Sequence, residues 1–256
     1  MSSSKYIELN RMFFELSADY TKNADNDDLE LSEALGLKAG NDIGWDELLK
    51  KHRVILLSKA GSGKTQEIRQ AAIKLQSNNK PAFFLRLENI PDGLEDSFEK
   101  GKIEEFEAWL ESSEEGWLFL DSVDEARLRD PKDFKKAIRI LTKHITPALD
   151  RAHIIITGRA NAWRAKTDLE LCRECFPYKP AAKKEDTEDD SEEISLEEET
   201  SSAKKISLKE ASGDTNFEFY TLSDLSDKQI EDFLKGNGIS DVSKILDDIG
   251  LVPSKL

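Results

Sequence analysis

Short apolar runs alternate with amphipathic stretches through the middle of this chain. The runs are four to six residues long, rich in Val, Ile, Leu and Phe, and typical of buried strands: 54–57, 82–87, 117–120, 153–156 and 217–222. Helical spacing of apolar residues separates them, most clearly at positions 134, 138, 141, 145 and 149. Because short turns cannot join parallel strands, this alternation predicts an α/β fold, with a mainly parallel five-stranded sheet between two layers of helices.

The regions before and after this core have different patterns. Residues 1–50 carry apolar side chains at loosely helical spacing from Tyr6 to Tyr20, followed by the segment 45–49, which predicts a helical N-terminal preface. We expect the preface to pack on the core, although a helix that binds a partner protein has the same pattern. Residues 51–222 would form the core, and a capping box at 226–229 would open a partial helical subdomain over residues 223–256.

An acidic, polar stretch interrupts the core between its fourth and fifth predicted strands. Residues 178–216 contain almost no large apolar side chains, and ten carboxylates fall between Glu185 and Glu199. Because such a segment cannot bury enough apolar surface to offset the entropy of ordering, we predict a disordered insert. The stretch from Glu185 to Glu199 has no basic residue and carries −10 of the formal net charge of −15, so the rest of the chain is only mildly acidic.

The net negative charge bears on the partners of the protein. It repels phosphate backbones and anionic lipids, so we expect neither direct nucleic-acid binding nor membrane binding. The apolar runs are far shorter than the roughly 18 residues of a membrane span, and the first residues lack a secretory apolar region. We therefore expect a cytoplasmic protein.

Two cysteines, Cys172 and Cys175, stand three positions apart. This spacing could provide half of a zinc site or a redox pair. No second pair of Cys or His follows at zinc spacing, which favours two reduced thiols on a helix.

A glycine-rich loop follows the first predicted strand directly. It matches the phosphate-binding loop pattern except for a serine at the first glycine position, and its residues are Ser58, Lys59, Ala60, Gly61, Ser62, Gly63, Lys64 and Thr65. Gly61 and Gly63 let backbone N–H groups converge on phosphates at the start of a helix, where the dipole is positive. Lys64 would contact the β and γ phosphates, and the Thr65 hydroxyl would bind Mg²⁺. Ser58 fits the turn only if its φ angle is negative.

Carboxylates and an arginine follow two later strands. Asp121, Asp124 and Glu125 come at the carboxyl end of the run 117–120, where open α/β sheets bind their ligands. Asp121 would orient Mg²⁺ through water, and Asp124 or Glu125 could act as general base for an attacking water; capping of the next helix is the alternative. Arg159 follows the fourth run and could sense the γ phosphate, although an ordinary surface ion pair would also explain it.

These motifs together resemble the NACHT-type branch of the STAND class of P-loop NTPases. The small Ser122 after Asp121 and the acidic pair two positions later are the most specific features, and the similarity covers about residues 45–240. The resemblance implies binding of ATP with Mg²⁺, slow hydrolysis, and a nucleotide-controlled switch between a closed monomer and an assembled oligomer in signalling or defence. By residue, it implies phosphate binding by Gly61, Gly63 and Lys64, Mg²⁺ binding by Thr65 and Asp121, catalysis by Asp124 and Glu125, and sensing by Arg159.

Proteins of that family also carry a winged-helix domain and a repeat sensor, which these 256 residues do not contain. We therefore expect the nucleotide-binding part of a larger protein, a split-gene product or a decayed relative, acting with protein partners or further domains.

Two functional hypotheses stay open. The chain is an ATP-hydrolysing switch module, or it binds nucleotide to organise partners without useful turnover. The acidic pair favours hydrolysis, because a pure binder needs no positioned base. A small-molecule kinase would need a substrate lid and an acceptor pocket, for which the sequence offers no candidate. Guanine specificity is disfavoured, because no Asn-Lys-x-Asp motif follows the loop.

Overall fold

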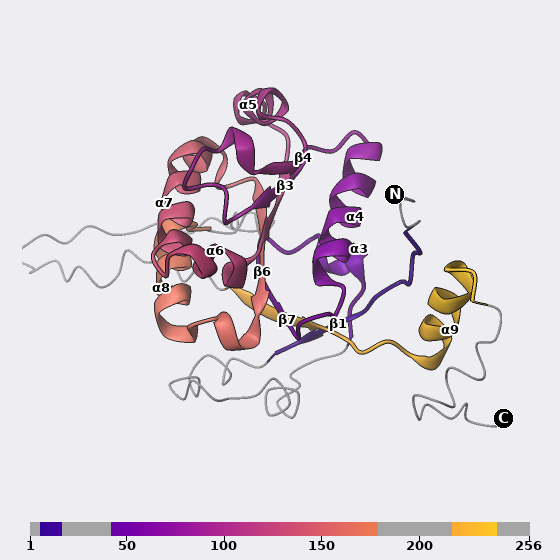
Figure 1. Ribbon diagram of the computed structural model, residues 1–256. Coiled ribbons are helices and arrows are strands. Elements are labelled where there is room, and N and C mark those ends of the chain that lie inside the picture. The colour runs from indigo at the N-terminus through magenta and orange to yellow at the C-terminus, as the bar shows by residue number, and fades with distance from the viewer. Residues whose placement is uncertain (1–5, 17–41, 179–216, 240–256) are drawn as a thin grey trace, which may run out of the picture.

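Five parallel strands form the centre of a seven-stranded sheet (Figure 1). The computed structural model describes residues 6–16, 42–178 and 217–239. The strands are β1 (Phe13–Glu15), β2 (Arg53–Ser58), β3 (Ala82–Arg86), β4 (Phe98–Lys100), β5 (Gly116–Asp121), β6 (Ala152–Arg159) and β7 (Glu218–Leu222). Their order in the sheet is β1-β7-β2-β6-β5-β3-β4, and only the edge strands β1 and β4 are antiparallel to their neighbours.

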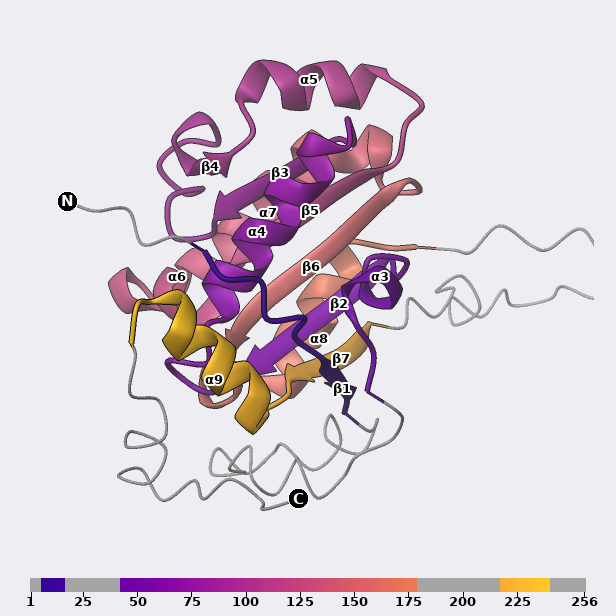
Figure 2. The ribbon, with the colours of Figure 1, turned by 90° about the vertical axis from the view of Figure 1, so that its right-hand side faces the viewer.

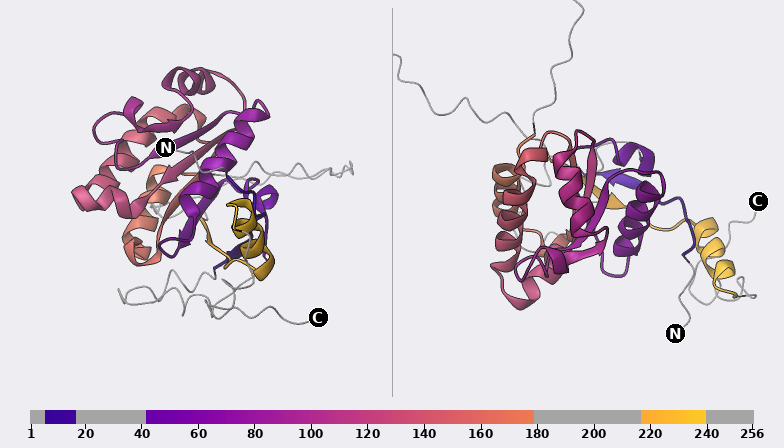
Figure 3. Two further views of the ribbon diagram at one scale, coloured as in Figure 1. Left: turned by 45° about the vertical axis from the view of Figure 1, so that its right-hand side comes forward. Right: turned by 90° about the horizontal axis from the view of Figure 1, so that it is seen from above.

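Helices cover both faces of the sheet. They are α3 (Trp45–Leu48), α4 (Lys64–Ser77), α5 (Ile103–Glu111), α6 (Val123–Arg129), α7 (Asp133–Ile145), α8 (Ala165–Cys175) and α9 (Asp227–Gly236). α3 and α4 lie on one face and α6, α7 and α8 on the other, which gives three layers (Figures 1 and 3). The predicted α/β fold with a mainly parallel sheet is therefore confirmed.

Burial on both faces explains the continuous apolar runs of the central strands. In β5, Leu118 and Leu120 belong to the core beneath α6, α7 and α8, whereas Trp117 and Phe119 belong to the core beneath α4. Each of these side chains is at most 6% exposed. Burial of one large apolar side chain stabilises the fold by about 1.5–3 kcal/mol, so β5 is held from both sides.

The sheet has two more strands than the five that the hydrophobic pattern predicts. The five predicted runs are all strands, but β1 and β4 each have only three residues and are largely half-buried at the edges. Such strands lack the long apolar run that marks a buried parallel strand. The helix predicted over 134–149 is also shorter, because α7 ends at Ile145 and a 3₁₀ turn with Pro147 follows.

The predicted helical preface is wrong for the described residues 6–16. This segment is extended, and Asn10 has a φ of 46°, a left-handed conformation that an α-helix cannot contain. Phe13 is fully buried and pairs with Leu222 of β7, so its apolar side chain serves a strand rather than a helix face. Within the described part of residues 1–50, α3 provides four helical residues.

The predicted capping box opens α9. Ser226 Oγ accepts a hydrogen bond from the Gln229 N–H at 3.3 Å, and Gln229 Oε1 accepts one from the Ser226 N–H at 2.9 Å. Gln229 Nε2 also donates to the Leu9 carbonyl at 2.6 Å, so α9 lies against the N-terminal segment (Figure 2). The rest of the predicted subdomain, residues 240–256, and all of the predicted insert after Tyr178 lie outside the described residues.

None of the described helices has the length and apolar character needed to span a membrane.

Candidate functional site

The carboxyl ends of β2 and β6 form the topological switch point of the sheet. The two strands are neighbours, but the chain leaves β2 into α4 on one face and leaves β6 into α8 on the other (Figure 3). Open α/β sheets bind ligands in the crevice where connections diverge in this way. The glycine-rich loop follows β2, Arg159 ends β6 and Asp121 ends the adjacent β5. All three motifs therefore meet at this edge.

The loop has the backbone that phosphate binding requires. Gly61 and Gly63 have φ angles of 75° and 85°, which residues other than glycine rarely adopt. A Cβ on Gly61 would meet nothing within 4 Å, so the space beside the loop is open. Ser58 remains in β2 without a positive φ, which meets the condition for serine at this position. Its Oγ accepts a hydrogen bond from Ser62 Oγ at 3.2 Å, which ties the two ends of the turn together.

Lys64 is the first residue of α4, and its side chain is placed to bind an anion. The residue is only 9% exposed. Among the described residues, no hydrogen-bond acceptor or carboxylate pairs with its ammonium group. A lysine ammonium without an anionic partner at the N-terminus of a 14-residue helix suits the binding of an anionic ligand, because both the side chain and the helix dipole supply positive charge there.

Thr65 and Asp121 bring two distant motifs into contact. The Thr65 hydroxyl donates to Asp121 Oδ2 at 2.8 Å, and Asp121 is completely buried. The Thr157 hydroxyl donates to the other carboxylate oxygen, Oδ1. Hydroxyl and carboxylate oxygens are the ligands that Mg²⁺ prefers, so the residues present fit the predicted Mg²⁺ site.

Arg86, which is not among the predicted site residues, joins the carboxylates of the site. It ends β3, and its Nη1 lies 3.0 Å from both Asp121 Oδ2 and Glu125 Oε2. Its Nε donates to Glu99 Oε2 at 2.7 Å, and Arg69 also pairs with Glu99. Burial lowers the pKa of Arg86, but Asp121, Glu99 and Glu125 together raise it above its ordinary value. The guanidinium therefore remains a cation.

The same network sets the ionisation of Glu125. Burial raises the pKa of its carboxyl, the nearby Asp121 raises it further, and Arg86 opposes both. The net direction is upward, so Glu125 holds its proton to a higher pH than a free glutamate.

Asp124 forms an ion pair with Arg159, whereas the neighbouring Glu125 pairs with Arg86. Its Oδ2 lies 2.9 Å from Arg159 Nε, and its Oδ1 accepts a hydrogen bond from the Arg159 backbone N–H at 3.1 Å. Ser122, rather than either acidic residue, caps α6, because its Oγ accepts from the Glu125 N–H at 3.4 Å. Arg159 therefore has an ion-pair partner, and Glu125 is the member of the acidic pair that faces Asp121 through Arg86.

Arg11 connects the glycine-rich loop to the segment that leads into α9. Its Nη1 donates to the Ser62 carbonyl at 3.1 Å and its Nη2 to the Ser223 carbonyl at 2.6 Å. No sequence signal points to this residue, because the contact joins positions 51 and 212 residues away. Arg86 could have been found, since it follows a buried strand as Asp121 and Arg159 do.

The cysteines behave as the simpler interpretation predicts. Cys172 and Cys175 are free, buried and both on α8. Burial raises the pKa of both thiols, so they stay protonated and are poor metal ligands or nucleophiles.

Neither a known family model nor any curated protein sequence significantly matches the chain.

Proposed function

We propose that this chain is an ATP-binding and slowly ATP-hydrolysing switch module of the NACHT/STAND type. The contact of 2.8 Å between Thr65 Oγ1 and Asp121 Oδ2 carries the proposal. The two residues come from motifs 56 positions apart, and they present adjacent oxygen ligands beside a loop of phosphate-binding shape.

The loop supplies the binding of the phosphates. The positive φ angles of Gly61 and Gly63 would let backbone N–H groups of the loop face the phosphates, and the Lys64 ammonium, unpartnered among the described residues, would supply a positive charge there. Mg²⁺ held by Thr65 and Asp121 would offset the charge of the β and γ phosphates. The binding energy then comes mainly from charge-assisted hydrogen bonds in a partly desolvated site.

Glu125 is the residue best placed to act as general base. Arg86 holds its carboxylate 3.0 Å from a nitrogen that also contacts Asp121, so the base is fixed beside the proposed Mg²⁺ ligand. An ionised Glu125 would accept the proton of the attacking water. Arg159, fixed by Asp124, would contact the γ phosphate from the adjacent strand.

One observation favours the alternative of binding without useful hydrolysis. Both members of the acidic pair are already in ion pairs, Asp124 with Arg159 and Glu125 with Arg86. A carboxylate that stays in an ion pair is a weaker base, because the cation stabilises its ionised form. Measuring the rate of ATP hydrolysis distinguishes a module that only binds nucleotide from one that also hydrolyses it.

Calorimetric titration of the full chain with ATP, ADP and GTP, with and without Mg²⁺, tests the proposal. We expect Lys64→Ala to weaken ATP binding by at least about 100-fold, which is about 2.7 kcal/mol. Lys143→Ala is the matched control, because Lys143 is an exposed lysine in the last turn of α7, outside the loop, and should change affinity little. Thr65→Val should remove the effect of Mg²⁺ on affinity. Equal ATP affinity in wild type and Lys64→Ala would exclude a phosphate-binding loop.

A further inference from the structure

A second group of candidate ligands lies at the opposite edge of the sheet. His52 and Glu115 directly precede β2 and β5, and His153 is the second residue of β6. These are the three adjacent central strands, and the group lies at their amino ends. Because six strand residues span about 20 Å, the group is well separated from the glycine-rich loop and Asp121 at the carboxyl ends.

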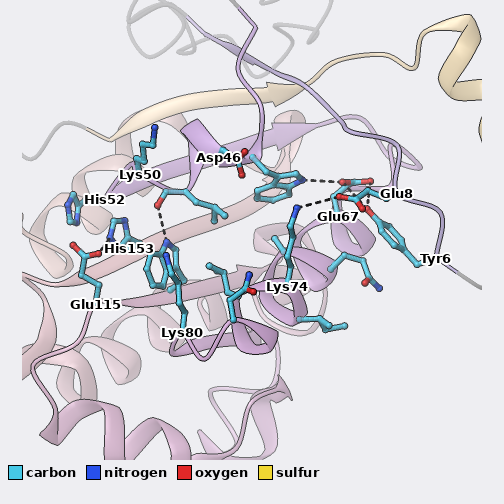
Figure 4. Close-up of a pocket in the computed structure, with 18 residues that line it drawn as sticks. Tyr6, Glu8, Asp46, Lys50, His52, Glu67, Lys74, Lys80, Glu115 and His153 are labelled. Atoms are coloured by element: carbon cyan, nitrogen blue, oxygen red, sulfur yellow. Dashed lines mark hydrogen bonds and ion pairs between the residues drawn. The ribbon is translucent and has the colours of Figure 1, made fainter.

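The three side chains converge in space. Their nearest ligand atoms all lie within 4.8 Å of one another. Figure 4 shows them together at one end of a cavity of about 700 Å³, with Lys50 and Lys80 nearby and Glu67 and Tyr6 at the other end. The group therefore adjoins a space large enough for a small molecule.

His153 has a buried ring nitrogen without a hydrogen-bond donor or cation among the described residues as its partner. Its Nδ1 lies 2.9 Å from the Lys51 carbonyl, which can only accept, so Nδ1 carries the hydrogen and Nε2 carries a lone pair. The residue is 3% exposed, and Nε2 has no hydrogen-bond partner in the described part of the chain. Glu115 Oε2 faces it at 3.7 Å, too far for a hydrogen bond. Two acceptors thus face each other, and a cation between them would satisfy both.

His52 offers a second unsatisfied nitrogen. Its Nδ1 is buried and, within residues 6–16, 42–178 and 217–239, has no hydrogen-bond partner. Its ring stacks on His153, with centroids 4.1 Å apart, and Trp117 stacks on the ring of His153 at 4.8 Å. The Trp117 stack and the hydrogen bond to the Lys51 carbonyl hold His153 in place. His52 is half-buried and also stacks on Tyr178, with centroids 4.0 Å apart, and Glu115 is exposed.

We propose that His52, Glu115 and His153 form a binding site for a divalent transition metal of the zinc class. Two imidazoles and a carboxylate are a ligand set of zinc, whereas Mg²⁺ takes oxygen ligands. The hydrogen bond from His153 Nδ1 to the Lys51 carbonyl is the outer contact that orients a metal-bound histidine.

Closing the site requires Glu115 to approach and the His52 ring to tilt. Tetrahedral ligands about 2.0–2.1 Å from zinc lie about 3.4 Å apart, so the present atoms approach by about 1.4 Å. The exposed Glu115 approaches, and His52 tilts out of its stacks on His153 and Tyr178, because stacked imidazoles direct their lone pairs side by side rather than at one ion. His153 stays fixed through its contacts with Lys51 and Trp117. Three protein ligands leave a fourth position for water or an anion, next to the cavity with Lys50 and Lys80.

Titration of the untagged, metal-free 256-residue chain with Co²⁺ and Zn²⁺ in excess Mg²⁺ tests this site. We expect one Co²⁺ per chain, with the visible bands of a four- or five-coordinate nitrogen and oxygen site, displaced by Zn²⁺. Removing a residue that only hydrogen-bonds a metal ligand lowers metal affinity by about 10–100-fold. His153→Gln removes a ligand itself, so it should weaken Zn²⁺ binding by about 100-fold or more. Glu115→Gln should weaken it by about 10-fold or more, and because Glu115 is exposed this variant should fold normally. His144→Gln, at the exposed third histidine of the chain on α7, should bind as wild type does.

Other results would overturn the proposal. Equal Zn²⁺ affinity in wild type, His153→Gln and Glu115→Gln would exclude these ligands. A thiolate-to-cobalt charge-transfer band would assign the metal to Cys172 and Cys175. Displacement of Co²⁺ by Mg²⁺ would assign it to an oxygen site, and absence of any binding would mean that the three side chains do not form a metal site.

Discussion

Two neighbouring residues of the candidate nucleotide site have different partners. Asp124 forms a close ion pair with Arg159, with a second hydrogen bond from the Arg159 backbone. Glu125 and Asp121 both contact the Arg86 guanidinium. The pKa of Glu125 is raised, and burial is the largest cause. A base is more effective when its pKa is closer to the working pH, so the raised pKa of Glu125 suits it for proton transfer.

Glu125→Gln should separate binding from turnover. Glutamine keeps the size of the side chain but cannot accept the proton of water, so we expect ATP affinity to survive and hydrolysis to fall by roughly 10² or more. Single-turnover and steady-state phosphate release would measure this. Asp124→Asn serves as the comparison, and if it alone abolished hydrolysis, the roles within the pair would be exchanged.

The pH dependence of hydrolysis should depend on Arg86. The ionised form of Glu125 is the base, so the rate should rise with pH through the pKa of Glu125, which lies above that of a free glutamate. Arg86 lowers this pKa, so its loss in Arg86→Gln should move the acid limb of the pH–rate profile to higher pH. Arg69→Gln is the control, because Arg69 pairs with Glu99 rather than Glu125. An unmoved limb in Arg86→Gln would remove Glu125 from the proposed role.

The sequence pattern marked the candidate site residues that belong to motifs, but not the residues that contact them from other strands. The positive φ angles at Gly61 and Gly63 and the position of Asp121 follow from local pattern and strand order. Arg86 and Thr157 contact Asp121 only because β3 and β6 flank β5 in the sheet. That adjacency depends on topology, which the order of elements along the chain does not fix.

At the scale of elements, the start of β5 depends on close packing against α5. A Cβ on Gly116 would lie 2.3 Å from Trp109 Cε2, and Trp109 is itself only 2% exposed. The indole cannot retreat easily, because its Nε1 donates to the Glu114 carbonyl at 3.0 Å. Glycine at this position therefore lets the helix approach the strand.

Gly116→Ala should destabilise the fold by about 1–3 kcal/mol, the usual cost of overpacking a buried contact. Urea denaturation would measure the free energy of unfolding. Gly93→Ala is the matched control, because its Cβ would meet only Asp96 Oδ2 at an ordinary 3.7 Å. Equal stability of the two variants would show that α5 moves away without cost.

Elements were predictable where burial imposes a periodic pattern. The parallel strands are apolar on both faces, so they stand out as continuous runs. β1 and β4 are three-residue edge strands whose existence depends on pairing with other strands: β1 with β7, far away in sequence, and β4 with the preceding strand β3. The apolar residues of segment 6–16 resembled a helix face, but their burial against β7 and α9 is a tertiary effect that local spacing cannot reveal.

At the scale of the whole molecule, the N-terminal segment and α9 form a unit beside the candidate nucleotide site. Gln229 bonds to the Leu9 and Asn10 carbonyls, and Gly236 packs closely on Ile7. Arg11 then links this unit to the loop through the Ser62 carbonyl. Figures 1 and 2 show α9 outside the α3 and α4 layer, next to the N-terminal segment. A nucleotide switch needs such a connection between the phosphate site and a separate element.

Arg11 should therefore couple nucleotide binding to α9. A shift of the Ser62 carbonyl on phosphate binding changes the Arg11 contacts to Ser62 and Ser223, and residue 223 leads directly into α9. We expect saturating Mg-ATP to change hydrogen exchange of residues 227–236 in wild type and to leave it unchanged in Arg11→Gln. Coupling of this kind is demonstrated only when the contact alters the response of one site to the other.

Arg129→Gln is the control for this experiment, because Arg129 is an exposed arginine paired with Asp92 and should keep the wild-type response. Arg11→Gln is compared at ATP concentrations that saturate each variant, so that weaker binding cannot imitate a lost response. A response of α9 that persists in Arg11→Gln would mean that another contact carries the signal. A wild-type α9 that ignores Mg-ATP would leave a nucleotide-binding module without a switch, because the connection through Arg11 would then hold the two parts together without transmitting a change.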